Sequence, residues 1–311
     1  MNKSAPEIIE INSDNWINSN PLFLKELKGK VILLDFWAYS CINCLRTLPS
    51  LKEIWRKYKK ENVVIIGIHT PEFMFEKDIE NVKVAVSKHK IDYPVANDPE
   101  GINWHRYGNK YWPRAVLINP FGEIVMEHVG EAGYDTIEGK IIELIDPENK
   151  KKFIRINEEK RLYDPYISRE TYAGSLRNSG IGSSKVCFES SCDVYIDPGK
   201  HTQDIIYLDG SWDQKKEYLT FNGDKGYIVF RFHAKEVNVV LSGVGIVEIL
   251  LDNVSLTSNN SGKEVSFHNN KSYLKIDGPD VFNIVNIKRF ETKELKIIPF
   301  KNMEIYAYTF G

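Results

Sequence analysis

Two cysteines separated by only two residues, Cys41-Ile42-Asn43-Cys44, are the clearest chemical signal in the sequence. Thiols at this spacing can close into a disulfide and reopen, which is the chemistry of thiol–disulfide exchange. Zinc ribbons use the same spacing, so the pair alone leaves a metal site open. An apolar, β-prone run at residues 31–34 precedes the pair and a helical pattern follows it, and this context favours a redox dithiol.

Cys41 is the predicted nucleophile of this dithiol. At the N-terminus of a helix its sulfur meets unpaired backbone N–H groups and the positive end of the helix dipole, which favour the thiolate. Cys44, one helical turn further on, can then attack the mixed disulfide and release the product. Asp35 follows four aliphatic residues, and desolvation there raises its pKa, so it is the candidate acceptor of the Cys44 proton. The alternative for Asp35 is a solvated carboxylate at a strand end.

Regular elements around the dithiol are predicted from periodicity. Apolar residues recur at three- and four-residue steps over residues 45–58, which predicts an amphipathic helix, and Pro49 is expected to kink it. Further elements are predicted as a strand at 63–68, a helical stretch at 75–90, a short extended piece at 93–95, a strand opened by Pro113, a hairpin turn at 119–122 and a helix at 134–144.

The order of these features resembles a thioredoxin site, from Asp35 and Trp37 through the two cysteines to Pro49. The extra unit formed by the helical stretch at 75–90 and the extended piece at 93–95 resembles the insertion of the TlpA-like and peroxiredoxin-like branches. This resemblance implies that the Trp112–Pro113 bond is cis and faces the dithiol, where the preceding residue offers backbone groups to an extended substrate. An ordinary trans proline at a strand start is the alternative.

Longer segments resemble the soluble C-terminal region of DipZ proteins: residues 36–44, 69–73, 111–113 and 130–134, and later 170–174, 208–212 and 307–311. The resemblance implies a TlpA-like thioredoxin domain followed by a β-sandwich similar to a carbohydrate-binding module. DipZ proteins usually begin with a CcdA-type membrane domain, which has no counterpart in these residues. The expected fold is therefore an α/β thioredoxin-like domain with a TlpA-type insertion, followed by an all-β jelly-roll sandwich.

Chain length agrees with two domains, since 311 residues are enough for two independent cores. We expect a redox domain at residues 1–152 and a β-sandwich at residues 153–311, joined by charged chain. Short extended runs separated by Gly, Asn and Asp fill the second half and predict antiparallel strands, among them 227–232, 237–241, 282–287 and 295–298.

Residues that contact substrate are expected near the dithiol, namely Trp37, Tyr39, Trp112 and Arg114. In the second half, a glycan is a candidate ligand because aromatic and acidic side chains occur close together there. A stacking platform would use Trp212, Tyr207, Tyr218 and Tyr172, with Asp209 and Asp213 nearby. The alternative is that these aromatic side chains belong to the core, which is common for aromatics in strands.

A second cysteine pair, Cys187 and Cys192, flanks four residues. It can form a structural disulfide in an oxidising compartment, hold a metal, or act as a second redox pair. A zinc site of all four cysteines is disfavoured, because it would leave the helix-end geometry of Cys41 unused. No metal or cofactor is expected, and the histidines near the apolar framework, His69, His105 and His128, are interpreted as hydrogen-bonded structural residues.

Charge and hydropathy restrict the setting of the protein. The formal net charge of −2 gives no reason to expect nucleic acid as a partner. No run approaches the roughly twenty apolar residues that cross a bilayer, and the first residues lack a signal peptide. A soluble protein is expected, cytoplasmic as written, or extracytoplasmic if an export or membrane segment has been removed.

The predicted function is that of a thiol–disulfide oxidoreductase acting on protein thiols and disulfides. It requires an electron-donor or electron-acceptor protein, and the resemblance suggests a CcdA-type membrane protein. The alternative is a glycan- or protein-binding module whose dithiol has a structural or sensing role. A thiol peroxidase is less favoured, because the lone peroxidatic cysteine of such enzymes is missing. Neither oligomeric state nor the direction of electron flow follows from the sequence.

Overall fold

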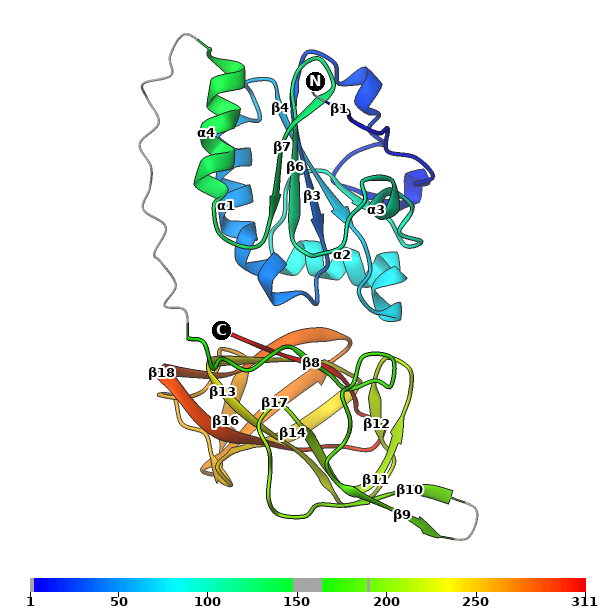
Figure 1. The fold of residues 1–311 in the computed structure, drawn as a ribbon, viewed down its shortest axis with the longest axis vertical. Helices are drawn as coiled ribbons and strands as arrows, with labels where there is room; N and C mark the ends of the chain where they lie inside the picture. The colour runs from blue at the N-terminus through cyan, green and yellow to red at the C-terminus, as the bar shows by residue number, and fades with distance from the viewer. Residues whose placement is uncertain (1–2, 148–163, 189–190) are drawn as a thin grey trace. The chain divides into compact units, whose positions relative to one another are not determined.

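The computed structural model describes residues 3–147, 164–188 and 191–311 (Figure 1). The chain divides into two compact units, Met1–Arg161 and Leu162–Gly311, and each has hydrophobic core clusters of its own. The boundary expected between residues 152 and 153 falls outside the described residues and stays a prediction.

The first unit is built on a seven-stranded sheet in the order β1-β7-β6-β3-β4-β5-β2. Its central strand β3 pairs in parallel with β4 and antiparallel with β6. The strands are β1 (Lys3–Ser4), β2 (Trp16–Ile17), β3 (Val31–Trp37), β4 (Val63–His69), β5 (Val95–Asn97), β6 (Arg114–Ile118) and β7 (Glu123–Val129).

Both faces of this sheet are covered, because β3 is apolar on both sides. Side chains of a strand alternate between the two faces. Val31, Leu33 and Trp37 join a cluster with helices α1 (Ile42–Tyr58), α2 (Ile79–Lys88) and α4 (Tyr134–Ile145). Ile32, Leu34 and Phe36 join a second cluster with the N-terminal segment and with residues of α3 (Ile102–Arg106). By the same alternation, Asp35 faces the side of α1.

The insertion lies between β4 and β6 and contains a 3₁₀ helix η3 (Met74–Lys77), α2, β5 and α3. Two further 3₁₀ helices, η1 (Ser13–Asn15) and η2 (Leu24–Glu26), lie near the N-terminus. The single helical stretch expected at residues 75–90 is divided at Asp78. The side chain of Asp78 accepts a hydrogen bond from the Glu80 backbone and so begins a new helix.

The second unit is all-β in its described part, with one large core cluster. Most strands follow the order β16-β17-β14-β18-β13-β19-β12-β11-β10-β9, while β15 pairs with β14 and β8 with β19. The strands are β8 (Thr171–Tyr172), β9 (Ser184–Phe188), β10 (Ser191–Ile196), β11 (Ile206–Gln214), β12 (Leu219–Phe221), β13 (Tyr227–Ser242), β14 (Val244–Leu251), β15 (Val254–Ser255), β16 (Val265–His268), β17 (Lys271–Asp277), β18 (Asp280–Ile298) and β19 (Glu304–Phe310).

Two pairs of short predicted strands are in fact two long strands, β13 and β18. Strand β13 pairs with β18 along its length, and its register shifts between Ala234 and Glu236. Even-numbered residues, such as Phe232, enter the core before this bulge, and odd-numbered residues, such as Val237, enter it afterwards. The change of phase made one bent strand look like two.

None of the helices in the described residues is long and apolar enough to cross a membrane.

Candidate active site: the Cys41–Cys44 dithiol

The dithiol lies at the beginning of α1, directly after the turn that follows β3. Cys41 is the N-cap residue of α1, and its carbonyl accepts a hydrogen bond from the Leu45 backbone at 3.1 Å. Both cysteines are free thiols, with Cys41 partly exposed and Cys44 buried. The outer sulfur is therefore accessible to a second molecule, whereas the inner one is shielded from solvent.

Asp35 is fully buried in β3, on the face covered by α1. Burial raises the pKa of Asp35 to about 7, and the neighbouring Tyr134 hydroxyl offsets part of the rise. The pKa of the Cys44 thiol is also raised, first by burial, then by Cys41, and in smaller part by the charge of Asp35. The Asp35 carboxylate and the Cys44 thiol are thus both buried and interact electrostatically, which suits Asp35 as the acceptor of the Cys44 proton.

Two buried tyrosines enclose Asp35, and sequence reasoning missed both. Burial and then the charge of Asp35 raise the pKa of Tyr93 and of Tyr134, so both remain neutral phenols beside the carboxyl group. Tyr134 is the first residue of α4, and Tyr93 precedes β5 by two residues. Neither position carries a sequence signal stronger than that of an ordinary core tyrosine. All three side chains are buried, so the carboxyl group of Asp35 lies away from solvent.

The proline predicted to face the dithiol precedes β6. The Trp112–Pro113 peptide bond is cis, in agreement with the expectation, and Pro113 is buried. The half-buried Trp112 ring lies against Trp104, with the ring centroids 4.1 Å apart. Trp112 and Cys41 both pack against the same core cluster. The neighbouring Tyr111 is 63% exposed, a surface position that the sequence pattern does not indicate.

Trp37 and Tyr39 do not line an open surface. Both are buried, and they pack against His69, Trp37 edge-on with ring centroids 5.2 Å apart and Tyr39 stacked at 5.6 Å. The prediction that their side chains meet a substrate from the surface is therefore wrong. They fill the interior directly behind the turn that carries Cys41.

Arg114 is likewise buried and does not offer its charge to a substrate. Its guanidinium donates hydrogen bonds to the Tyr107 carbonyl at 2.9 Å and to the Glu127 carboxylate at 2.8 Å. The expected substrate contact is wrong here too, because these two acceptors use the guanidinium within the fold. Of the four predicted contact residues, Trp112 alone keeps a partly exposed side chain.

His69 is a structural residue, as expected. It is buried at the end of β4, and its Nδ1 lies 3.0 Å from Oδ1 of Asn97. Burial lowers the pKa of His69 to about 4, so the ring is neutral near pH 7. His128 packs edge-on against Tyr134, whereas His105 is exposed and does not belong to the apolar framework.

The aromatic platform expected in the second unit does not form on its surface. Trp212 and Tyr207 are buried. Trp212 packs against Phe221 in the core, and its indole N–H donates to the Asp209 carbonyl at 2.9 Å. Tyr218 and Tyr172 are half-buried. The burial of Trp212 and Tyr207 agrees with the core alternative, whereas Tyr218 and Tyr172 stay partly exposed.

The second cysteine pair is described only by its backbone. Cys187 lies in β9 and Cys192 in β10, two antiparallel neighbours. The side chains of both lie outside the described part, so the role of this pair stays a prediction. Where side chains are described, no three His, Cys, Asp or Glu residues converge on a point that could hold a metal ion.

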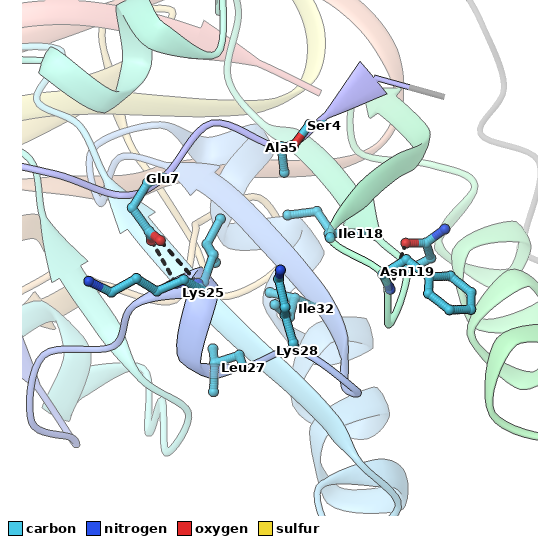
Figure 2. A pocket seen from close by; sticks show the side chains of 12 residues that line it. Ser4, Ala5, Glu7, Lys25, Leu27, Lys28, Ile32, Ile118 and Asn119 are labelled. Atoms are coloured by element: carbon cyan, nitrogen blue, oxygen red, sulfur yellow. Dashed lines mark hydrogen bonds between the residues drawn. The ribbon is translucent and has the colours of Figure 1, made fainter. Parts of the chain in front are cut away.

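A pocket of about 190 Å³ lies elsewhere in the first unit (Figure 2). Its lining includes Ile32 at the start of β3, whereas Cys41 follows the end of that strand. Glu7 at its edge accepts hydrogen bonds from the backbones of Leu24 and Lys25 at 2.6 and 3.0 Å. The pocket contains none of the predicted site residues and is not part of the dithiol site.

Comparison with known proteins agrees with the geometry of the site. A family model described as thioredoxin-like matches residues 29–124, and one described as a thioredoxin-like C-terminal domain matches residues 168–311. Thiol-disulfide oxidoreductase ResA of Bacillus thuringiensis is 31% identical over 139 residues, which cover 45% of this chain and 75% of that protein. The chain belongs to the thioredoxin-like thiol–disulfide oxidoreductases.

Within this oxidoreductase family, one similarity extends over both units. Protein DipZ of Mycobacterium tuberculosis is 30% identical over 320 residues, covering 99% of this chain and 43% of that protein. The chain thus spans less than half the length of this relative. A solved thiol:disulfide interchange protein from Chlorobium tepidum is 20% identical, with a TM-score of 0.40, over 47% of this chain and 97% of that one.

Proposed function

We propose that this protein exchanges disulfides with protein substrates through Cys41 and Cys44. The observation that carries the proposal is the asymmetry of the pair. One sulfur is accessible at the beginning of a helix, and the other is buried beside a carboxyl group with a raised pKa. This arrangement suits a two-step exchange. The outer thiol can form the mixed disulfide with the substrate first, and the inner thiol can then resolve it.

In the first step, the Cys41 thiolate attacks one sulfur of a substrate disulfide. A bond forms between the Cys41 sulfur and that substrate sulfur, the substrate disulfide breaks, and the second substrate sulfur leaves as a thiolate. The four N-terminal N–H groups of α1 and its dipole stabilise negative charge at this position.

In the second step, the Asp35 carboxylate accepts the proton of Cys44. The Cys44 thiolate attacks the Cys41 sulfur, the Cys41–Cys44 disulfide forms, and the remaining substrate sulfur leaves. The substrate disulfide gains two electrons and the dithiol loses two. The reverse sequence oxidises a substrate dithiol, and the direction depends on the reduction potentials of the two pairs.

The substrate is proposed to bind as an extended chain beside Trp112 and Pro113. Backbone groups next to the cis proline can pair with such a chain as an added strand does. The exposed ring of Tyr111 and the half-buried ring of Trp112 supply apolar contact surface. A protein segment with an accessible disulfide fits this description.

Insulin reduction by dithiothreitol tests the proposal. The wild-type protein should accelerate the reaction, Cys41→Ser should abolish the acceleration, and a Cys187→Ser/Cys192→Ser variant should retain it. Equal rates with and without the wild-type protein would contradict the proposed function. Acceleration that survives in Cys41→Ser would show that a different group carries it.

A further inference from the structure

Glu76 is a second fully buried carboxylate in the first unit, and the exchange steps above do not use it. It lies in η3, the first element of the insertion, which follows β4 and precedes α2. Its Oε1 accepts a hydrogen bond from the Ser40 backbone at 3.0 Å, and its Oε2 accepts from the Glu72 and Phe73 backbones at 2.6 and 3.1 Å. Three backbone N–H groups from two separate segments therefore converge on one side chain.

Ser40 is the residue immediately before the nucleophile, so this contact reaches the active turn itself. The turn is also closed by its own backbone, since the Cys41 N–H donates to the Ala38 carbonyl at 3.2 Å. On its other side, the Thr70 N–H donates to the Trp37 carbonyl at 3.0 Å. Glu76 adds a side-chain anchor from the insertion, and so joins the insertion to the position of Cys41.

The groups that face Glu76 allow its carboxyl group to gain or lose a proton near pH 7. From β4, Nε2 of His69 lies 3.9 Å from Oε1, but this ring is neutral near pH 7. From the turn between β4 and η3, the charge of Glu72 opposes ionisation of Glu76. Burial, followed by Glu72, raises the pKa of Glu76 to about 7, and the three N–H groups hold it back from a larger rise.

We propose that Glu76 is a positioning residue for the dithiol, which holds the Ser40 backbone and thereby sets the reactivity of Cys41. The inference rests on the proposed exchange function and adds a determinant outside the Cys-x-x-Cys segment. Ionised Glu76 can accept all three hydrogen bonds. A proton on Oε1 would turn that atom into a donor facing the Ser40 N–H, and the anchor would be lost.

The alkylation rate of Cys41 by iodoacetamide is the direct test. It is measured from pH 5.5 to 9 by mass spectrometry of the Cys41 peptide, in the reduced full chain. Wild type should show a component with a midpoint near pH 7 besides the titration of the thiol, and Asp35→Asn, which removes the other carboxyl group with a pKa of about 7, should keep it. Glu76→Gln should lose this component and change the rate at pH 8 by about threefold to tenfold, roughly the net worth of one hydrogen bond.

Glu80→Gln is the matched control, because Glu80 belongs to the same insertion but its side chain is exposed and pairs with Lys83. It should retain the wild-type profile. If Glu76→Gln does not fold, Glu76→Asp serves instead, since it keeps the charge with a shorter reach. The Asp variant should keep the pH-dependent component and show a changed rate.

A Glu76→Gln profile that matches wild type would overturn the proposal, as would an Asp variant that is fully wild-type when Gln does not fold. An equal change in Glu80→Gln would also overturn it. Alkylation reports the Cys41 thiol whether or not the protein reduces insulin. Failure of this inference is therefore distinguishable from failure of the proposed function.

Discussion

Replacing Asp35 by Asn should stabilise the first unit, and more strongly at high pH. In the folded protein Asp35 keeps its proton up to about pH 7, whereas the unfolded chain loses it near its ordinary value of 3.8. Between these two pH values the folded state binds more protons than the unfolded state. The free energy of unfolding of the wild type therefore falls as pH rises through this range. Asn cannot ionise and avoids the loss.

The magnitude follows from the two pKa values of Asp35. The pKa rises from 3.8 to about 7, which is about three pH units, each worth ~1.4 kcal/mol. Ionisation of Asp35 therefore lowers the free energy of unfolding of the wild type by roughly 4 kcal/mol above pH 8. At pH 4.5 the same relation gives only about 1 kcal/mol. A pH-independent difference in stability between Asn and a protonated Asp cancels in this comparison. The stability of Asp35→Asn relative to wild type should therefore rise by about 3 kcal/mol from pH 4.5 to 8.5.

Urea unfolding of the reduced protein, followed by tryptophan fluorescence, measures this change. Five of the six tryptophans lie in the first unit, so the signal reports mainly on it. Asp92→Asn is the matched control, because Asp92 is exposed and pairs with Lys59. It should shift stability by less than about 1 kcal/mol at every pH. A stability difference between Asp35→Asn and wild type that does not grow with pH would show that the folded protein does not retain the Asp35 proton up to about pH 7.

Two further substitutions test the corrected roles of predicted contact residues. Arg114→Met should destabilise the first unit by about 1–3 kcal/mol, because it leaves the buried Tyr107 carbonyl without its donor, whereas Glu127→Gln should cost less than about 1 kcal/mol. Urea unfolding checks both, and equal effects would contradict the buried role of the guanidinium. Trp212→Ala should cost the second unit about 3–5 kcal/mol by removing a core side chain beside Phe221. Near-UV circular dichroism during urea unfolding measures it, and a loss below about 1 kcal/mol would mean that Trp212 is not a core residue.

The central part of the site could be predicted because it depends on local spacing. The apolar run at residues 31–34 predicts a strand that contains Asp35, and the structure extends this strand as β3, with Asp35 on the face covered by the helix that begins after Cys41. The cis bond at Pro113 agreed with the family resemblance. These features follow from neighbours in sequence or from a long shared motif.

Long-range packing explains what could not be predicted. From the sequence, Trp37 and Tyr39 look like surface aromatics beside a reactive thiol. In the fold both rings are buried and pack against His69 from β4. In the sequence Glu76 looks like an ordinary charged residue, but in the fold η3 places its carboxylate where it accepts a hydrogen bond from the Ser40 backbone. The bulge in β13 shifts the alternation by one residue, and no turn residue marks it.

Trapping a mixed disulfide in Cys44→Ser tests the central claim most directly. With the inner thiol removed, attack on a substrate disulfide should stop after the first step, because no second sulfur can release the product. The variant is incubated with a disulfide-containing peptide and digested without reductant for mass spectrometry. A peptide adduct is expected on Cys41 in Cys44→Ser, and none is expected on Cys44 in Cys41→Ser. An adduct on Cys44, or none on Cys41, would contradict the assignment of Cys41 as the nucleophile.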